Sequence, residues 1–184
     1  MKKLINFFYI KNQKGFSLIE MMVVVVILGL IVLGLVTFFT GGTKSWVAGQ
    51  YQLAAQRNAR QAMDRMVREI REASDIIANS TTSKEINFNT PRDPNLNYSW
   101  SGKKWDPVFE DIDSLINHVQ ILTFQYFDIL DVEVTLPLTE KTAAKISKVH
   151  IDLKVDVDKD SNPDITLNTD VKLRNFGVYE YTLN

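Results

Sequence analysis

An uncharged apolar run near the amino terminus limits what this chain can fold into. From Met21 to Phe39 no residue is charged, and only Gly29, Gly34 and Thr37 interrupt the apolar side chains. At a rise of ~1.5 Å per residue this run makes a helix about 30 Å long, the hydrocarbon thickness of a bilayer. We therefore expect a membrane-spanning helix followed by one modest domain with a core of its own.

The composition excludes several kinds of site. The 184-residue chain has no cysteine, which rules out disulfides, thiolate catalysis and cysteine-based metal sites. A net charge of −1 gives no support for nucleic acid or an anionic surface as the main partner. The sequence holds no nucleophile elbow, phosphate-binding loop or metal-ligand run. We therefore expect a non-enzymatic protein, and a membrane-anchored extracellular enzyme is the least favoured alternative.

The residues before the apolar run are basic. Residues 1–15 contain no acid and four lysines, Lys2, Lys3, Lys11 and Lys14. The positive-inside rule places this flank in the cytoplasm and the carboxyl-terminal side across the membrane. A secretory signal also starts with a basic region, but its apolar core has only ~7 to 15 residues. Cleavage of such a signal near Gly41 and Gly42 is the alternative interpretation.

Glu20 stands at the start of the apolar run, in the sequence Gly15-Phe16-Ser17-Leu18-Ile19-Glu20. A charge deep in a bilayer costs ~3 kcal/mol or more, so an acid here suggests a function and a cationic partner. The alternative is a headgroup position at the helix start, where the helix macrodipole favours an anion.

The basic leader, Gly15, the Phe16–Glu20 sequence and the unbroken apolar run together resemble the type IV prepilin signal. The resemblance implies that a membrane-embedded prepilin peptidase cuts between Gly15 and Phe16 and methylates the new amino terminus of Phe16. It also implies a single-pass protein of the bacterial cytoplasmic membrane that later enters an extracytoplasmic filament. Its partners would be membrane lipid, other pilin or pseudopilin subunits and an inner-membrane assembly platform. The proline common in the family's helix is missing from Val32 to Phe39, which puts the usual kink in doubt.

Elementary chemistry explains why each part of this signal is needed. Gly15 has no Cβ, so a peptidase can approach the backbone closely. Cleavage exposes an α-amino group with a pKa of ~7.7 to 8, which is mostly cationic at neutral pH. Because such a cation cannot be buried alone, Glu20 of one subunit can neutralise the Phe16 amine of its neighbour and select the axial register.

We divide the chain into a cleaved leader (1–15), a transmembrane and filament-core helix (16–40), a continuation of that helix (41–78) and a β-sheet head (79–184). Apolar residues at helical spacing support the continuation: Ala59, Met63, Met66, Val67, Ile70, Ala73 and Ile77. Charged residues fall largely off this stripe: Arg57, Arg60, Arg65, Arg68, Glu69, Arg71 and Glu72. Because acids are interleaved, we favour a solvated helix face over a nucleic-acid patch.

Four later segments alternate between apolar and polar residues, as strands do: 85–89, 119–128, 149–157 and 165–173. A helix followed by antiparallel strands predicts an α+β fold, with the long amino-terminal helix packed on an antiparallel sheet. This layout also resembles the pilin head. More narrowly, residues 98–105, 122–128 and 171–175 resemble the larger minor subunits, the W-type minor pilin or the J-type pseudopilin of type II secretion.

The turn between the last two strands is rich in oxygen ligands that Ca²⁺ accepts: Asp156, Asp158, Asp160, Asn162 and Asp164. The EF-hand pattern fails, because Ser161 stands where glycine is needed. The favoured interpretation is a solvated turn shaped by Asn162-Pro163. We therefore expect no cofactor, with calcium as the open alternative.

Trp100 and Trp105 flank two lysines, Lys103 and Lys104. Such a cluster can stack on single-stranded DNA or a glycan, so a pilus-tip adhesive or DNA-uptake module is the alternative function. The favoured interpretation is a hairpin whose tryptophans cover the sheet.

Overall fold

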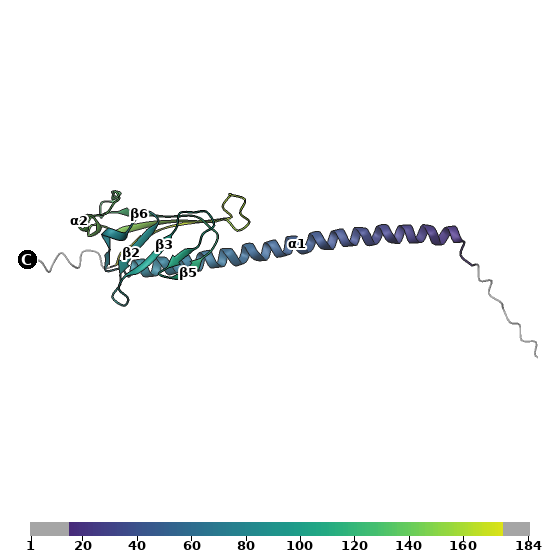
Figure 1. Cartoon of the computed structure of the whole chain (residues 1–184), viewed down its shortest axis with the longest axis horizontal. Helices are drawn as coiled ribbons and strands as arrows, with labels where there is room; N and C mark the ends of the chain where they lie inside the picture. The colour runs from purple at the N-terminus through teal and green to yellow at the C-terminus, as the bar shows by residue number, and fades with distance from the viewer. Residues whose placement is uncertain (1–14, 175–184) are drawn as a thin grey trace, which may run out of the picture. The chain divides into compact units, whose positions relative to one another are not determined.

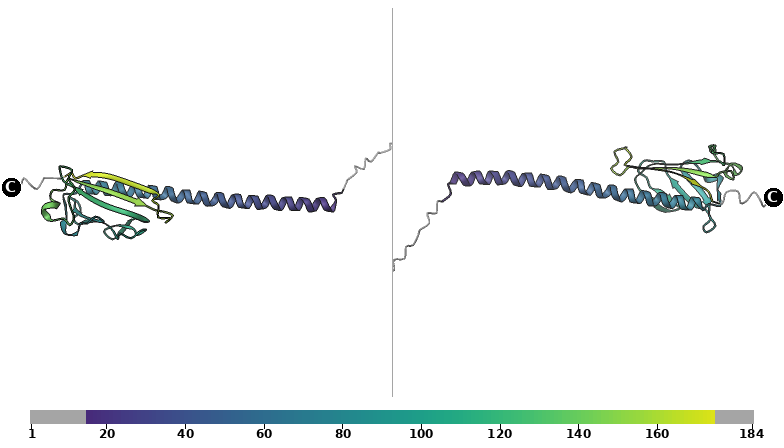
Figure 2. Two further views of the ribbon diagram at one scale, coloured as in Figure 1. Left: turned by 90° about the horizontal axis from the view of Figure 1, so that it is seen from above. Right: turned by 180° about the vertical axis from the view of Figure 1, so that it is seen from behind.

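The computed structural model describes residues 15–174, which divide between two compact units, 1–47 and 48–184 (Figures 1 and 2). Helix α1 (Leu18–Arg71) contributes residues to both units. The first unit holds only the amino-terminal part of α1 among its described residues. The second holds the rest of α1 and every strand.

No other part of the described chain, residues 15–174, covers the helix in the first unit. All of its large apolar side chains are exposed, with Phe38 at 75% and Leu30 at 65%. Its threonine hydroxyls donate to backbone carbonyls of the preceding turn, with shortest distances of 2.9 Å for Thr37, Thr40 and Thr43. These three hydroxyls are thus satisfied within the helix, as an apolar medium requires.

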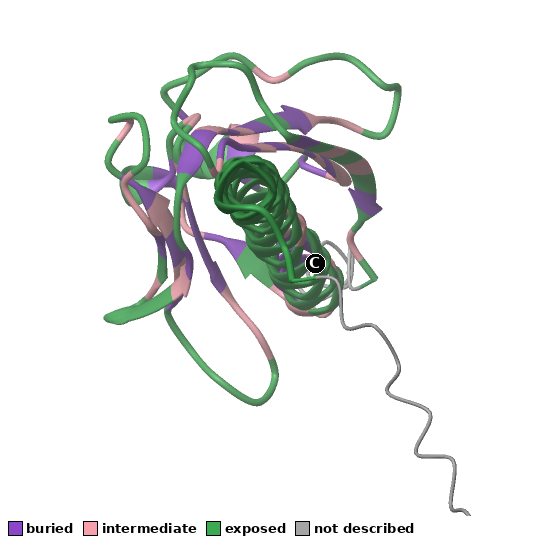
Figure 3. Cartoon of the chain, turned by 90° about the vertical axis from the view of Figure 1, so that its right-hand side faces the viewer, coloured by how far each residue is buried: buried purple, intermediate pink, exposed green. Residues whose placement is uncertain are grey.

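In the second unit, α1 turns one face to the core. Its buried residues recur at the three- and four-residue spacing of one helix face: Ala59, Ala62, Met63, Met66 and Ile70. The predicted apolar stripe is therefore confirmed, with Val67 at its margin as a partly buried member. Figure 3 shows the strands of this unit curving around the helix.

The helix ends earlier than predicted. We placed its end near Ala78, which is wrong, because α1 stops at Arg71. The following residues form strand β1 (Asp75–Ile76) and a 3-10 turn, η1 (Ala78–Ser80). The Ser74 N–H donates to the Asn89 carbonyl at 2.8 Å, so this segment pairs with a strand instead. The apolar residues here fit both a helical and a strand periodicity. The edge of β2 (Glu85–Asn89) is available for pairing, so the segment forms a strand.

The head contains two antiparallel sheets. The first sheet has five strands, and their order in the sheet is their order in the sequence, β1-β2-β3-β4-β5. Besides β1, its members are β2 (Glu85–Asn89), β3 (Leu96–Trp100), β4 (Val108–Glu110) and β5 (Asp113–Ile116). The sequence predicted β2 as a strand and a hairpin at Trp100 and Trp105, which the structure forms from β3 and β4. The buried side of β3 supplies Leu96, Tyr98 and Trp100 to the core.

The second sheet has three strands, in the order β6-β7-β8. They are β6 (Val119–Phe127), β7 (Lys148–Val155) and β8 (Ile165–Lys172), and a short helix, α2 (Glu140–Ala143), lies between β6 and β7. The alternation predicted for β7 is confirmed, because Val149, Ile151, Leu153 and Val155 are all buried. This is the predicted α+β arrangement, with two sheets in place of one.

Few bonds connect the two sheets. The Phe124 N–H donates to the Ser83 carbonyl at 2.8 Å, and the Tyr126 hydroxyl donates to the Thr82 carbonyl at 2.9 Å. Both contacts join β6 to the segment just before β2. They leave the inner faces of both sheets free to pack against α1 in a single core.

A polar clasp ties α1 to the first sheet. The buried Tyr98 hydroxyl donates to Glu69, and Arg65 bridges Glu69 at 3.2 Å and Glu110 at 2.5 Å. Burial, and then the charge of Glu69, raises the pKa of Glu110 above its usual value, although Arg65 opposes this shift. Burial and the bond to Glu69 likewise raise the pKa of Tyr98, so its hydroxyl keeps the proton that it donates.

Asp156, directly after β7, is fully buried and organises the β7–β8 turn. Its carboxylate accepts the Trp105 Nε1–H at 3.1 Å and the backbone N–H groups of Lys159 at 2.8 Å and Ser161 at 2.9 Å. Burial alone would raise the pKa of Asp156, but these donors outweigh it and lower the pKa. The group is therefore a buried anion that ties the turn to the loop after β3.

Replacing Asp156 by asparagine should lower the free energy of unfolding by about 1 to 3 kcal/mol at neutral pH, because an amide cannot accept all three N–H groups. The lowered pKa makes this stabilisation complete above the unfolded value of ~3.9 and lost as the pH falls through the folded pKa. Urea unfolding of the full chain in detergent, followed by tryptophan fluorescence across this range, measures both effects.

The matched control is Asp113→Asn at an exposed position of β5, which should stay within about 0.5 kcal/mol of the parent. An Asp156→Asn variant as stable as this control would contradict the buried-anion role.

Candidate functional site

The candidate processing and assembly site lies where the described chain begins. Gly15, Phe16 and Ser17 precede α1, and Glu20 lies in its first turn. The Ser17 carbonyl accepts the N–H groups of Glu20 at 3.0 Å and Met21 at 3.2 Å, which fixes the start of the helix. The side chain of Phe16 is 77% exposed. The predicted junction is thus accessible and next to a helix end, while the basic leader, residues 1–14, lies outside the described residues.

The fold itself does not require glycine at position 15. A Cβ built there meets nothing within 4 Å, and the residue does not adopt a left-handed backbone conformation. By contrast, Gly102 has a φ of +79° and its Cβ would meet the Lys84 side chain, so that glycine has a structural reason. A reason for Gly15 must therefore come from outside the folded chain.

Glu20 is exposed and has no ion pair within the described residues 15–174. Its position in the first turn puts the carboxylate near the positive end of the helix macrodipole, which favours a negative charge. The macrodipole supplies only a partial charge. A full positive charge for Glu20 would have to come from another group.

The helix that follows is able to span a membrane by its length and composition. Its most apolar window has a mean hydropathy of 3.1 and none of it is buried. This agrees with the predicted anchor. The described helix also passes through Gly29, Gly34, Gly41 and Gly42 without interruption.

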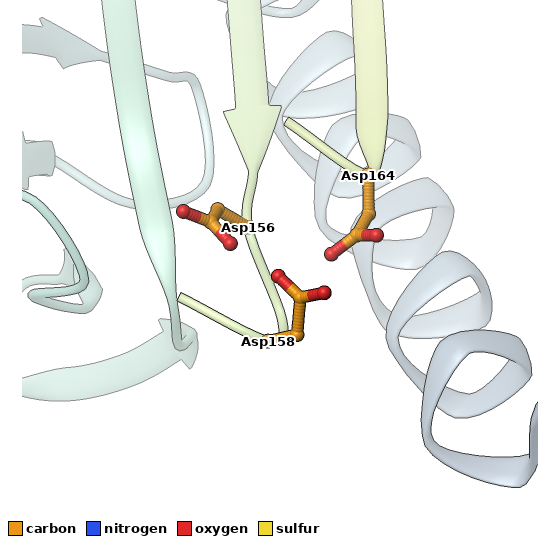
Figure 4. Close-up of side chains that lie close together, drawn as sticks. All are labelled: Asp156, Asp158 and Asp164. Carbon is orange, nitrogen blue, oxygen red and sulfur yellow. The ribbon is translucent and has the colours of Figure 1, made fainter. Parts of the chain in front are cut away.

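The structure brings together three of the five predicted calcium ligands. Carboxylate oxygens of Asp156, Asp158 and Asp164 lie within 4.8 Å of one another at the ends of β7 and β8 (Figure 4). Asp160 and Asn162 are not part of this group. Asp160 instead accepts the Asn162 N–H at 2.7 Å.

The loop already uses these carboxylates as hydrogen-bond acceptors. Asp158 accepts the Asp160 N–H at 3.1 Å, and Asp164 accepts the Val157 N–H at 2.7 Å. The N–H of Asp160 lowers the pKa of Asp158, but partial desolvation and the charges of Asp160, Asp164 and Asp156 outweigh it and raise the pKa. The donor set matches Ca²⁺ in chemistry, while its geometry also matches an aspartate-shaped turn.

The tryptophan and lysine cluster does not present two stacking faces. Trp100 is only 8% exposed, and the Lys84 ammonium lies 5.8 Å above its ring. Trp105 is 37% exposed and is tied to Asp156 by its Nε1–H. These tryptophans serve the head's packing, as the favoured interpretation expected.

Sequence reasoning missed the buried role of Asp156. Alternating aspartates in a turn gave no sign that one of them would bind Trp105 across a long stretch of chain. The alternation of β7 predicts Asp156 on the wet face with His150, Asp152 and Lys154, and this prediction is wrong, because Asp156 is fully buried.

The comparisons with known proteins address the amino-terminal segment. Residues 10–36 match the family described as Prokaryotic N-terminal methylation motif. Neither the curated proteins nor the solved structures give a significant match. The matched range covers the Gly15–Phe16 junction, Glu20 and most of the apolar run. The chain therefore carries an amino-terminal segment similar to the prepilin signal of pilin-like proteins, on a helix that is long and apolar enough to span a membrane.

Proposed function

We propose that this protein is a structural subunit of a type IV pilus or of a type II secretion pseudopilus, of the larger minor class with W-type or J-type heads. The methylation motif on a fully exposed apolar helix carries this proposal. The α+β head, built from a long helix and antiparallel sheets, is consistent with it. In this role the chain binds and positions other subunits and performs no enzymatic reaction.

Processing comes first in this proposal. The protein enters the cytoplasmic membrane with its amino terminus in the cytoplasm, directed by Lys2, Lys3, Lys11 and Lys14. Prepilin peptidase cuts between Gly15 and Phe16 and methylates Phe16. The open surroundings of Gly15 support this step, because the folded chain gives no other reason for glycine there.

Assembly then depends on Glu20. The cleaved amine of one subunit and the Glu20 carboxylate of another neutralise each other as the apolar helices leave lipid and pack together. The lack of an ion pair for Glu20 among residues 15–174 leaves it available for this partner. Because a mispaired charge is costly in an apolar bundle, the pair excludes wrong axial registers even where its net stabilisation is small.

Calcium is not required in this proposal, and the β7–β8 turn should fold without it. Titration of the full chain in detergent with millimolar CaCl₂ should give no saturable heat, because Asp156, Asp158 and Asp164 already accept N–H groups of the turn and of Trp105. Saturable heat that disappears in Asp158→Asn would instead establish a calcium site.

Replacing Gly15 by valine should block cleavage, because a branched side chain keeps the peptidase from the scissile backbone. The wild-type protein extracted from membranes should begin at Phe16 with one added methyl group, and Gly15→Val should begin at Met1. Intact mass and amino-terminal sequencing distinguish the two. The control Gly29→Val also has open surroundings and should be processed normally. A wild-type chain starting at Met1, or just after Gly42, contradicts the proposal.

Replacing Glu20 by alanine should leave insertion and cleavage intact but lower incorporation into filaments about tenfold, because the partner's amine is then buried without a counter-ion. Sheared filaments pulled down through a partner subunit report incorporation, and the membrane fraction reports processing. Ser17→Ala, an exposed neighbour, is the control. Normal incorporation of Glu20→Ala would refute the pairing.

A further inference from the structure

Four arginines form a straight column on the exposed side of α1. At about 100° per residue, Arg57, Arg60, Arg68 and Arg71 fall within a sector of about 80°, and the column is about 20 Å long. All four are exposed. The sector lies opposite the face that carries Ala59, Ala62, Met63, Met66 and Ile70 into the core. We call these four residues the arginine column.

The arginine column holds more cations than acids. Within residues 15–174 none of its members makes an ion pair, and Asp64 is the only acid in its sector. Glu69, which the sequence interleaves with these arginines, is turned away to Tyr98 and Arg65. The structure thus turns one of the interleaved acids, Glu69, away from the column, whereas Asp64 and Glu72 line the same surface pocket as Arg68, Arg71 and Arg174. At the end of the column the Arg174 N–H donates to the Arg71 carbonyl at 2.9 Å, which adds a further cation.

The opposite charge gathers in the β7–β8 turn, residues 156–164. This acidic turn has four aspartates against Lys159, and Asp158, Asp160 and Asp164 are exposed. The hydrogen bonds of Asp156 to Trp105 and to its own turn hold this charge in a fixed place. The pKa of Asp158 is raised partly by the neighbouring carboxylates, as expected where negative charge lacks a cationic partner.

The two charged surfaces cannot neutralise each other within one chain. Gln52 Nε2 donates to Asp164 Oδ1 at 3.1 Å, which places the acidic turn beside Gln52. Gln52 points from α1 in the same direction as Ala59 and Met66, and therefore away from the arginine column. A contact between the surfaces requires two molecules.

We propose that the arginine column of one molecule binds the acidic turn of a second copy of this chain. The contact joins two different surfaces, so it is heterologous, and each copy keeps a free turn at one end and a free column at the other. Such contacts generate an open row or a ring rather than a two-fold dimer. The proposal rests on the proposed function as a filament subunit and names the head-to-head contact within it.

Charge complementarity favours a protein partner over nucleic acid. A nucleic-acid-binding domain usually has a broad basic surface and a high pI, whereas this chain has a pI of about 6.1 and Asp64 within the column. Trp100 is buried, and the indole of Trp105 is held by Asp156, so the tryptophan pair does not supply a stacking surface beside the column.

The absence of native cysteine makes disulfide mapping direct. Two differently tagged full-length copies, one Asp160→Cys and the other Arg60→Cys, are expressed together in the host and oxidised in intact membranes. We expect a disulfide-linked species that carries both tags. The matched control replaces Arg60→Cys by Ile112→Cys, a 90% exposed position outside the column, and should give no such species.

A charge-reversal pair tests the same contact without oxidation. Copies carrying Arg60→Glu and Arg68→Glu should lose about tenfold in co-purification with one another, as should copies carrying Asp158→Arg and Asp160→Arg. The two kinds expressed together should associate again, because each reversed surface then meets its complement. Lys103→Glu with Lys104→Glu reverses two exposed cations outside the column and should change nothing.

A further cysteine pair separates this inference from the proposed function. Leu33→Cys, 63% exposed on the apolar helix, should cross-link to itself when the helices bundle. Helix cross-links without the Asp160–Arg60 species overturn the proposed contact and leave the filament function standing. Loss of both overturns the filament function. Arginine reversal that releases bound duplex DNA, while cross-links and co-purification stay unchanged, overturns the contact in favour of nucleic acid.

Discussion

The structure depends on one constraint: the apolar side chains in the first part of α1 require an apolar environment that the described residues do not provide. In this part every large apolar side chain is exposed. Each Å² of this apolar surface that stays in water has an unfavourable free energy of about 25 cal/mol. In the proposed function, lipid meets this need before assembly, and neighbouring helices meet it afterwards. Because Thr37, Thr40 and Thr43 satisfy their hydroxyls within the helix, both surroundings are acceptable without a change of secondary structure. An isolated chain of this kind is incomplete.

Hydrophobic contact alone does not determine the axial register between such helices, since apolar side chains are nearly interchangeable. A charge does determine it, because a misplaced carboxylate in an apolar bundle costs ~3 kcal/mol or more. The same logic applies in the head, where charges on the surface are segregated rather than mixed. Glu69 accepts a hydrogen bond from Tyr98, and Asp156 holds the acidic turn in place. Among residues 15–174 no member of the arginine column makes an ion pair. Glu20 and the segregated charges of the head are thus both available to a second molecule.

The sequence predicted the elements whose periodicity is long. The membrane helix, the core face of α1 and strands β2, β6, β7 and β8 all repeat an apolar pattern over several residues. Strand β5 (Asp113–Ile116) was missed because it is short and carries polar residues. The processing segment was recognisable because its motif, residues 15–20, is contiguous in the sequence. The bond between Trp105 and Asp156 was not, because only the tertiary fold brings these two loops together.

The segregation of head charges also bears on where the subunit sits in a filament. A heterologous contact leaves one unsatisfied surface at each end of a row, so a subunit used once at a tip would keep either its arginine column or its acidic turn bare. Bare charge of this size is tolerable in water, but it then contributes nothing to assembly. In the proposed contact both surfaces are used only where a copy of this chain lies on each side.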